Sequence, residues 1–255
     1  MRIDIDTYKE ILDTLTRNKG RTILTGFGVF WGIFMLVALM GSGNGLQDKR
    51  ASNFEGFATN SAMVWAQNTT KPYHGYRKGR SWNMTTRDVE RLKENVSELN
   101  IVTPITFSGT ASLVFGDKKT QGSVKGVEAD YTKVEEPSMS FGRFLNTMDE
   151  VQRRKVCVIG KRIYSSLFPT GGDPCGQLIR VDSTYYEVVG VNVSSGNMNI
   201  GGRADETVYV PMTLMQQVYN LGEDVHLIAM TGKPGVKMSA VSQHIREVIA
   251  RAHDI

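Results

Sequence analysis

An uncharged, strongly apolar segment near the N-terminus constrains this chain more than any other feature. No Asp, Glu, Lys or Arg occurs from Thr22 to Gln47, and 14 of the 18 residues from Ile23 to Met40 are apolar. A helix needs about 20 mostly apolar residues to cross roughly 30 Å of hydrocarbon. The segment therefore predicts one transmembrane helix at residues 23–46.

Two other interpretations of the segment fit the sequence less well. A cleaved signal peptide usually has an apolar core of about 7–15 residues behind a short basic start. Here the apolar run is longer and begins only after residue 22. A buried helix of a soluble protein normally keeps a polar face, which this segment lacks.

Basic residues on either side of the segment predict its orientation. Arg17, Lys19 and Arg21 come just before it, whereas the flank at residues 48–50 contains an Asp beside a Lys and an Arg. Because the more basic flank usually stays in the cytoplasm, we expect the N-terminus there and everything after Gln47 outside.

Residues 1–22 precede the apolar segment on the cytoplasmic side. Apolar residues recur among residues 1–18 at helical spacing, namely Ile5, Tyr8, Ile11, Leu12 and Leu15. This pattern predicts an amphipathic helix, which either lies in the membrane interface or packs on a partner subunit.

Glycines within and after the apolar segment suggest two local features. Gly28 and Gly32 have the GxxxG spacing that lets two membrane helices approach closely. We interpret them as a helix–helix contact, the alternative being ordinary glycine usage in a membrane helix. The run from Gly41 to Gly45, which contains three glycines, is expected to end the helix.

The remaining residues predict an α+β domain with a β-rich middle, followed in sequence order by a long terminal helix. The expected elements are strands at 61–66, 101–107, 110–115, up to Val127, 155–159, 177–181, 184–193, 207–210 and 224–231, with helices after the capping residue Thr85, at 161–168, at 212–219 behind Pro211 and from Met238 onward. An irregular segment is expected after Val127.

No pattern in the chain predicts catalysis, a cofactor or a metal. The phosphate-loop pattern GxxxxGK[ST], the zinc pattern HExxH and the nucleophile pattern GxSxG do not occur. The four histidines, His74, His226, His244 and His253, lack partners at metal-ligand spacing, so we interpret them as surface or satisfied side chains. The net charge of +4 without a basic stripe argues against a nucleic-acid partner.

Two cysteines, Cys157 and Cys175, are too few for a disulfide-stabilised scaffold. Cys157 lies in an apolar run typical of a buried strand, and Cys175 follows a turn. Pairing in an oxidising compartment stays open, and an unpaired, buried Cys157 is the favoured interpretation.

An ordered set of short motifs along the chain resembles the MacB-like permeases of ABC transporters. Residues 21–28, Arg-Thr-Ile-Leu-Thr-Gly-Phe-Gly, look like the family's entry into its first membrane helix. The further motifs, in the family's order, are Leu46, Gly56, Gly126-Val127 with Tyr131, Gly142-Arg143-Phe144 with Asp149, Val158-Ile159-Gly160, Leu167-Phe168, Gly176, residues 186–191 and Tyr209-Val210-Pro211.

This resemblance implies a permease subunit of the MacB/FtsX type in the bacterial inner membrane. It implies a dimer or paired permease, an extracytoplasmic core domain of two lobes with residues 108–204 as the inserted β-rich lobe, and structural roles for Gly142, Arg143, Asp149, Gly160 and Pro211. A separate ABC ATPase subunit would hydrolyse ATP, and the permease would transmit that motion outward for export or efflux, with a periplasmic adaptor and an outer-membrane channel as possible partners.

The resemblance has two limits. The chain starts almost at the first membrane helix, so the ATPase is expected on another polypeptide. It also ends at Ile255, before the three further membrane helices expected of a complete family member, so we expect a fragment. The alternatives are a single-pass sensor or ligand-binding ectodomain and a membrane-anchored enzyme.

Overall fold

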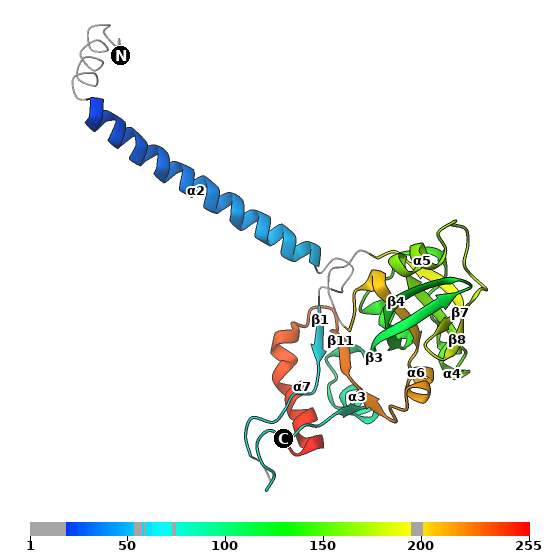
Figure 1. Cartoon of the computed structure of the whole chain (residues 1–255). Coiled ribbons are helices and arrows are strands. Elements are labelled where there is room, and N and C mark those ends of the chain that lie inside the picture. The colour runs from blue at the N-terminus through cyan, green and yellow to red at the C-terminus, as the bar shows by residue number, and fades with distance from the viewer. Residues whose placement is uncertain (1–18, 54–57, 59, 73–74, 195–200) are drawn as a thin grey trace. The chain divides into compact units, whose positions relative to one another are not determined.

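The computed structural model describes residues 19–53, 58, 60–72, 75–194 and 201–255, with side chains left out at 41–53. The chain forms two compact units, Met1–Ser52 and Asn53–Ile255 (Figure 1). The amphipathic helix predicted for residues 1–18 lies outside the described residues.

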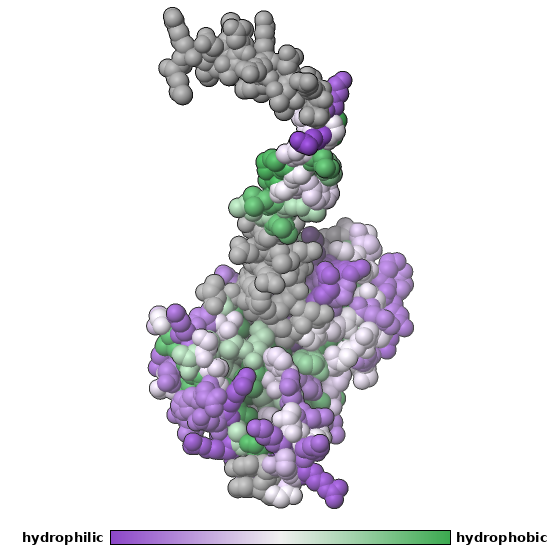
Figure 2. Space-filling model, turned by 90° about the vertical axis from the view of Figure 1, so that its left-hand side faces the viewer, coloured by the Kyte–Doolittle hydropathy of each residue, from purple (hydrophilic) through white to green (hydrophobic). Residues whose placement is uncertain are grey.

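The first unit contains the predicted apolar helix, α2 (Lys19–Asn53), which is 35 residues long. Its first 22 residues, Lys19–Met40, are long and apolar enough to cross a membrane, and none of their most apolar window is buried. Figure 2 shows these apolar side chains on the surface of the helix, after hydrophilic ones at its start. The helix predicted at this position is therefore confirmed.

The glycine-rich run from Gly41 to Gly45 does not end this helix, so that prediction was wrong. The helix continues through the run to Asn53. A glycine in a helix interior costs only about 1 kcal/mol relative to alanine. Because an existing helix extends by one hydrogen bond for each residue added, three glycines weaken it without breaking it.

The second unit is built on a mixed sheet that has nine strands among the described residues, in the order β1-β11-β3-β4-β9-β6-β8-β5 with β7 beside β3 and β8. Its strands are β1 (Ser61–Val64), β3 (Leu99–Phe115), β4 (Lys118–Val127), β5 (Met139–Gly142), β6 (Val156–Gly160), β7 (Leu178–Val181), β8 (Thr184–Asn192), β9 (Thr207–Pro211) and β11 (Leu227–Gly232). A small second sheet pairs β2 (Met84–Thr85) with β10 (Asp224–Val225).

Helices and 3-10 turns pack on this sheet. They are α3 (Thr86–Asn95), α4 (Thr147–Val151), α5 (Lys161–Leu167), α6 (Met212–Val218) and α7 (Met238–His253), with 3-10 turns η1 (Ala129–Lys133) and η2 (Ala204–Glu206). This α+β architecture with a β-rich part agrees with the predicted fold class.

Six strands of the sheet close on themselves. β3 pairs with β4, β4 with β9, β9 with β6, β6 with β8, β8 with β7, and β7 with β3 again. Ring closure pairs the strand edges that an open sheet would expose. Inward side chains such as Leu113, Cys157 and Val188 form one buried cluster, to which α5 and α6 add Ile163 and Met215.

A second core lies on the other side of β3, beyond this ring. It joins α3 and α7 to the strands β1, β11 and the first part of β3, with Leu92, Ile228 and Ile245 among its buried residues. Figure 1 shows α7 beside β1 and β11. A third core covers the outer face of β4, β9 and β6 and includes Tyr131 and Tyr209.

The structure differs from the predicted elements in several places. The strand predicted at 224–231 is two strands, since β10 pairs with β2 whereas β11 pairs with β1 and β3, and the helix α4 was not predicted. Residues 101–107 and 110–115 belong to one strand, β3, because a register shift between Phe107 and Thr110 absorbs Ser108 and Gly109 without ending it. The segment after Val127, expected to be irregular, contains η1 and β5. The lobe boundaries 108 and 204 stay a prediction, and the closed ring also includes β9, which follows them.

Close backbone contact at Gly160 leads to a prediction about stability. A Cβ at this position would lie 2.4 Å from the Ala204 carbonyl oxygen and 2.5 Å from Asp205. Because both neighbours are backbone, we expect Gly160→Ala to lower the free energy of unfolding by about 1–3 kcal/mol in urea titrations.

Gly109→Ala is the matched control, since no atom lies within 4 Å of its added Cβ. It should change the free energy of unfolding by less than about 0.5 kcal/mol. Equal effects of the two substitutions would contradict the packing argument.

Candidate functional site

A buried carboxylate, Asp149, organises one end of the second unit. Arg143 binds it with two hydrogen bonds, Nη1 to Oδ2 at 2.6 Å and Nη2 to Oδ1 at 3.1 Å. The Asp149 side chain is fully buried, and Arg154 approaches the same carboxylate at 3.4 Å. A bidentate arginine–carboxylate pair fixes the relative orientation of its two side chains as well as pairing their charges. The pair therefore determines how α4 packs against the end of β5.

Local backbone geometry places Arg143 next to Asp149. Gly142 has φ +64°, and a Cβ there would lie 2.1 Å from the Val189 carbonyl oxygen, so only glycine fits. Asn146 caps α4: its Oδ1 accepts from the Asp149 N–H at 2.9 Å, while the Asn146 N–H donates to Asp149 Oδ2 at 3.0 Å. This reciprocal cap was missed in the sequence, although the Asn146–Asp149 spacing is its usual signal.

The next residue, Glu150, connects α4 to α6. Its carboxylate accepts from the backbone N–H of Met212 at 2.9 Å and of Thr213 at 2.7 Å. These two donors are the unpaired N–H groups at the start of α6, directly after Pro211. Of the five predicted motif residues, Gly142, Arg143 and Asp149 lie together, and Glu150 connects them to the helix that begins directly after Pro211.

Gly160, the fifth motif residue, lies elsewhere. β6 and β9 are antiparallel, with Ile159 opposite Val208, so Gly160 is at the end of the sheet far from Pro211. Gly28 and Gly32 belong to α2, and apart from the nearby backbone of α2 itself, no atom of a residue that the structure describes lies within 4 Å of a Cβ added to either.

The two neighbouring carboxyl groups respond differently to this environment. Burial alone would raise the pKa of Asp149, but the hydrogen bonds from Arg143 and Asn146 outweigh it and hold the pKa below its usual value. For Glu150, burial dominates over the hydrogen bonds from Thr213 and Met212, and its pKa is raised. Asp149 is therefore the more firmly ionised of the two.

A second carboxylate cluster holds the end of α7. Asp88 is fully buried and lies 2.8 Å from His253 Nε2, and Arg91 donates to it at 2.9 Å. The His253 ring packs on Trp82 with ring centroids 4.5 Å apart. Arg80 donates to the backbone carbonyl oxygens of His253 and Asp254. Helix α7 is thus attached at its last turn, and His253, which we expected to be a surface or satisfied side chain, is paired with Asp88.

Lys125 is the most buried cationic side chain among the described residues. Its Nζ lies 3.5 Å from the Tyr131 hydroxyl and 5.3 Å from the centre of the Tyr209 ring, and the Tyr131 hydroxyl donates to Glu135. Burial lowers the pKa of Lys125, and the charge of Glu135 opposes that shift. This cluster connects β4, β9 and η1. Its side chains are buried, so they do not face a binding site at the surface.

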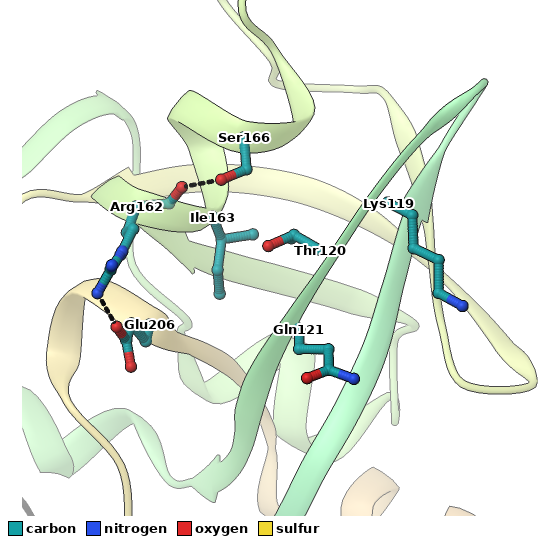
Figure 3. A pocket seen from close by; sticks show the side chains of 7 residues that line it. All are labelled: Lys119, Thr120, Gln121, Arg162, Ile163, Ser166 and Glu206. Atoms are coloured by element: carbon teal, nitrogen blue, oxygen red, sulfur yellow. Dashed lines mark hydrogen bonds and ion pairs between the residues drawn. The ribbon is translucent and has the colours of Figure 1, made fainter.

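A polar pocket of about 440 Å³ lies between β4, α5 and η2. Figure 3 shows Thr120 pointing toward Ile163, while Lys119 points away from the pocket. Arg162 and Glu206 both line the pocket and form an ion pair with each other, so the charge of Arg162 is already balanced. The pocket lacks the converging free groups that catalysis would need.

The described residues contain no cluster of three or more His, Cys, Asp or Glu side chains that could hold a metal ion. Both cysteines are free: Cys157 is buried inside the strand ring and Cys175 is partly exposed. Burial raises the pKa of Cys175 to about 11, which makes its thiol a weak nucleophile at neutral pH.

Comparison with protein families identifies the second unit and part of α2. The model of the MacB-like periplasmic core domain matches residues 22–248. The macrolide export ATP-binding/permease protein MacB of Pectobacterium atrosepticum is 24% identical over 249 residues, which cover 98% of this chain and 37% of that protein. MacB of Psychrobacter arcticus is 24% identical over 83% of this chain and 31% of its own length. The chain thus spans about a third of the length of these relatives.

Solved structures share the fold. The periplasmic region of MacB from Actinobacillus actinomycetemcomitans superimposes with a TM-score of 0.64 at 21% identity, covering 79% of this chain and 87% of that one. The extracellular domain of the ABC-type transporter YknZ from Gram-positive bacteria gives a TM-score of 0.61 at 14% identity, covering 75% and 95%.

The ion pair of Asp149 predicts how stability depends on pH. Its pKa is lower in the folded chain than in the unfolded one. The contribution of Asp149 to the free energy of unfolding is therefore complete at pH values above its pKa in the unfolded chain. This contribution is lost as the pH falls through the pKa of Asp149 in the folded chain. Asp149→Asn should lower the free energy of unfolding by about 1–3 kcal/mol at pH 7 and by clearly less near pH 3.

Asp130→Asn is the control, because the Asp130–Lys133 pair is solvent-exposed and contributes little. Urea titrations at several pH values measure both variants. A loss in Asp149→Asn that is the same at pH 7 and pH 3 would show that the charge of Asp149 does not stabilise the fold.

Proposed function

Since the chain belongs to the family of MacB-like periplasmic core domains, we propose that it is the membrane-anchored part of an ABC-transporter permease that transmits motion across the membrane. In this proposal α2 spans the bacterial inner membrane with its N-terminus in the cytoplasm. Residues 47–255 lie in the periplasm. ATP is hydrolysed by a separate ABC ATPase subunit, and the permease transmits the resulting change outward in export or efflux.

One observation carries the proposal: the first and last elements of the second unit share a core. β1, the first strand after α2, pairs with β11, and its Ala62 and Val64 pack against the cluster that contains Val241 and Ile245 of α7. The Ala58 N–H also donates to the Val134 carbonyl at 2.9 Å, so the segment before β1 is held as well. A displacement delivered at residue 58 would therefore move a packed body, because close-packed cores transmit strain.

The sheet continues this path into the closed ring. β11 places Ile228 and Met230 in one core and Leu227 and Ala229 in another, since successive side chains of a strand face opposite sides. β3 then pairs with β11 through its first half and with β4 and β7 through its second half. A single strand of 17 residues thus connects the core next to α7 with the ring.

The remaining partners follow from the relatives and from α2. We propose that a separate ABC ATPase subunit binds ATP, and the relatives' name, ATP-binding/permease protein, supports a pairing of permease and ATPase. We propose that Gly28 and Gly32 contact a second permease helix in the bilayer, forming a dimer or a pair. A periplasmic adaptor and an outer-membrane channel complete the assembly in which export would occur.

Spin-label distances test the transmission of motion. The full-length protein, purified from membranes with its bound ATPase as a pair of copies, carries one label on each copy at Asp117, in the turn of the β3–β4 hairpin. Cys175→Ser removes the exposed thiol, and buried Cys157 can stay. We expect the distance distribution to change between the ATP-free state and the state trapped with ATP and vanadate.

A label pair at Arg87 and Glu247 is the internal control, because α3 and α7 share one core and should keep their distance. An unchanged distance distribution between the two Asp117 labels during active ATP turnover would contradict transmission through this domain. Purification without any nucleotide-binding subunit would contradict the permease assignment itself.

A further inference from the structure

We propose that an apolar cavity beside β1 is a binding site for a small, uncharged aromatic or alicyclic molecule. The cavity has a volume of about 550 Å³ and lies between the edge strand β1, the link from β10 to β11, and β3 at Phe107. Small-molecule sites in proteins typically have about 300–1,000 Å³ and mostly apolar walls with a few polar groups. The proposal does not depend on the transport function.

Flat rings dominate the walls of this cavity. Trp65, Trp82, Phe107 and His226 all line it, together with Met63 and Leu227. Trp65 keeps 53% of its surface exposed, although it directly follows a strand that packs on the domain core. An exposed indole beside other rings offers a stacking surface that a flat ligand would cover favourably.

His226 supplies a hydrogen-bond donor at the cavity. Its Nδ1 accepts from the Phe107 N–H at 3.1 Å, and its ring lies against the Phe107 ring at 4.7 Å between centroids. Burial lowers the pKa of His226, which keeps the ring neutral at neutral pH. A neutral ring that accepts at Nδ1 carries its proton at Nε2, and this group makes no hydrogen bond to any residue the structure describes.

Asn83 supplies the complementary acceptor. Its Nδ2 donates to Asp224 Oδ2 at 2.8 Å, an arrangement that leaves the amide oxygen available. None of the described residues that line the cavity is Asp, Glu, Lys or Arg. A charged ligand would lose its hydration there without gaining a counter-charge, so the site selects a neutral molecule with one acceptor and one donor.

The polar pocket of Figure 3 provides the contrast within the same domain. Its lining includes Lys119, Arg162 and Glu206, and it has no aromatic side chain. A neutral ring compound therefore distinguishes the two cavities. Thr120, which points toward Ile163 in that pocket, is a suitable position for a control substitution.

The chain permits a direct fluorescence test of binding. It contains three tryptophans, so Trp31→Phe leaves only Trp65 and Trp82, both at the cavity. The full-length chain with this change is placed in lipid nanodiscs and titrated with dansyl amide, a neutral naphthalene sulfonamide. Energy transfer from tryptophan to the dansyl group should rise and saturate.

Three further substitutions in this background locate the site. Ala66→Phe, which fills the cavity, should weaken binding at least tenfold, and His226→Phe, which keeps a ring but removes the donor, about fivefold or more. Thr120→Phe should leave binding within twofold. Circular dichroism melting checks that each variant folds, and Met63→Phe replaces Ala66→Phe if that variant does not.

Energy transfer that rises without saturation shows partition of dansyl amide into lipid and overturns the proposal. Saturable transfer that is equally strong in the cavity-filling variant and in Thr120→Phe overturns it as well. If the His226→Phe variant binds dansyl amide as tightly as the Trp31→Phe parent, His226 donates no hydrogen bond to the ligand, and the assigned ligand class is wrong.

Discussion

The exposed apolar surface of α2 is the constraint on which the rest of this structure depends. Phe30 and Leu39 show 61% and 72% of their surface, and the most apolar window of the helix has no buried residue. Burying one such side chain is worth about 1.5–3 kcal/mol, so leaving this surface in water would cost tens of kcal/mol over the whole helix. Hydrocarbon around α2 removes that cost and, in our account, makes the second unit a domain held at a membrane.

Charged groups in the second unit connect elements of the fold. Asp149 joins Arg143 to the cap of α4, Glu150 extends that connection to α6, and Asp88 holds the last turn of α7 through His253. Asp149 and Asp88 are buried, Glu150 is partly buried, and each is compensated by several donors, the condition under which a buried charge stabilises a unique arrangement. Together with three cores that share strands, these connections fit a domain that transmits displacement.

Much of the fold could be predicted from the sequence, because hydrophobic periodicity and turn residues determine local structure. Strands β6, β7, β8 and β9 lie within two residues of their predicted bounds. The sequence did not predict that β3 is one strand, because Ser108 and Gly109 look like a turn. The strand is recognised as continuous only because it pairs with β4 on both sides of the register shift. The cap that Glu150 forms on α6 brings together residues more than 60 positions apart in the sequence. The same is true of the aromatic side chains that line the apolar cavity. Only the tertiary structure reveals these contacts. The motif resemblance located Arg143 and Asp149 but not what they contact.

Alkaline carbonate extraction tests the central claim most directly. Membranes from cells that produce the full-length chain are washed with carbonate, and its distribution is compared with that of a Phe30→Lys, Phe34→Lys variant. Two lysines at the helix centre cost about 5–7 kcal/mol of insertion free energy. The account predicts that the parent chain stays in the membrane pellet and that the variant is released. Recovery of the parent chain in the supernatant, with residues 19–40 intact, would contradict it.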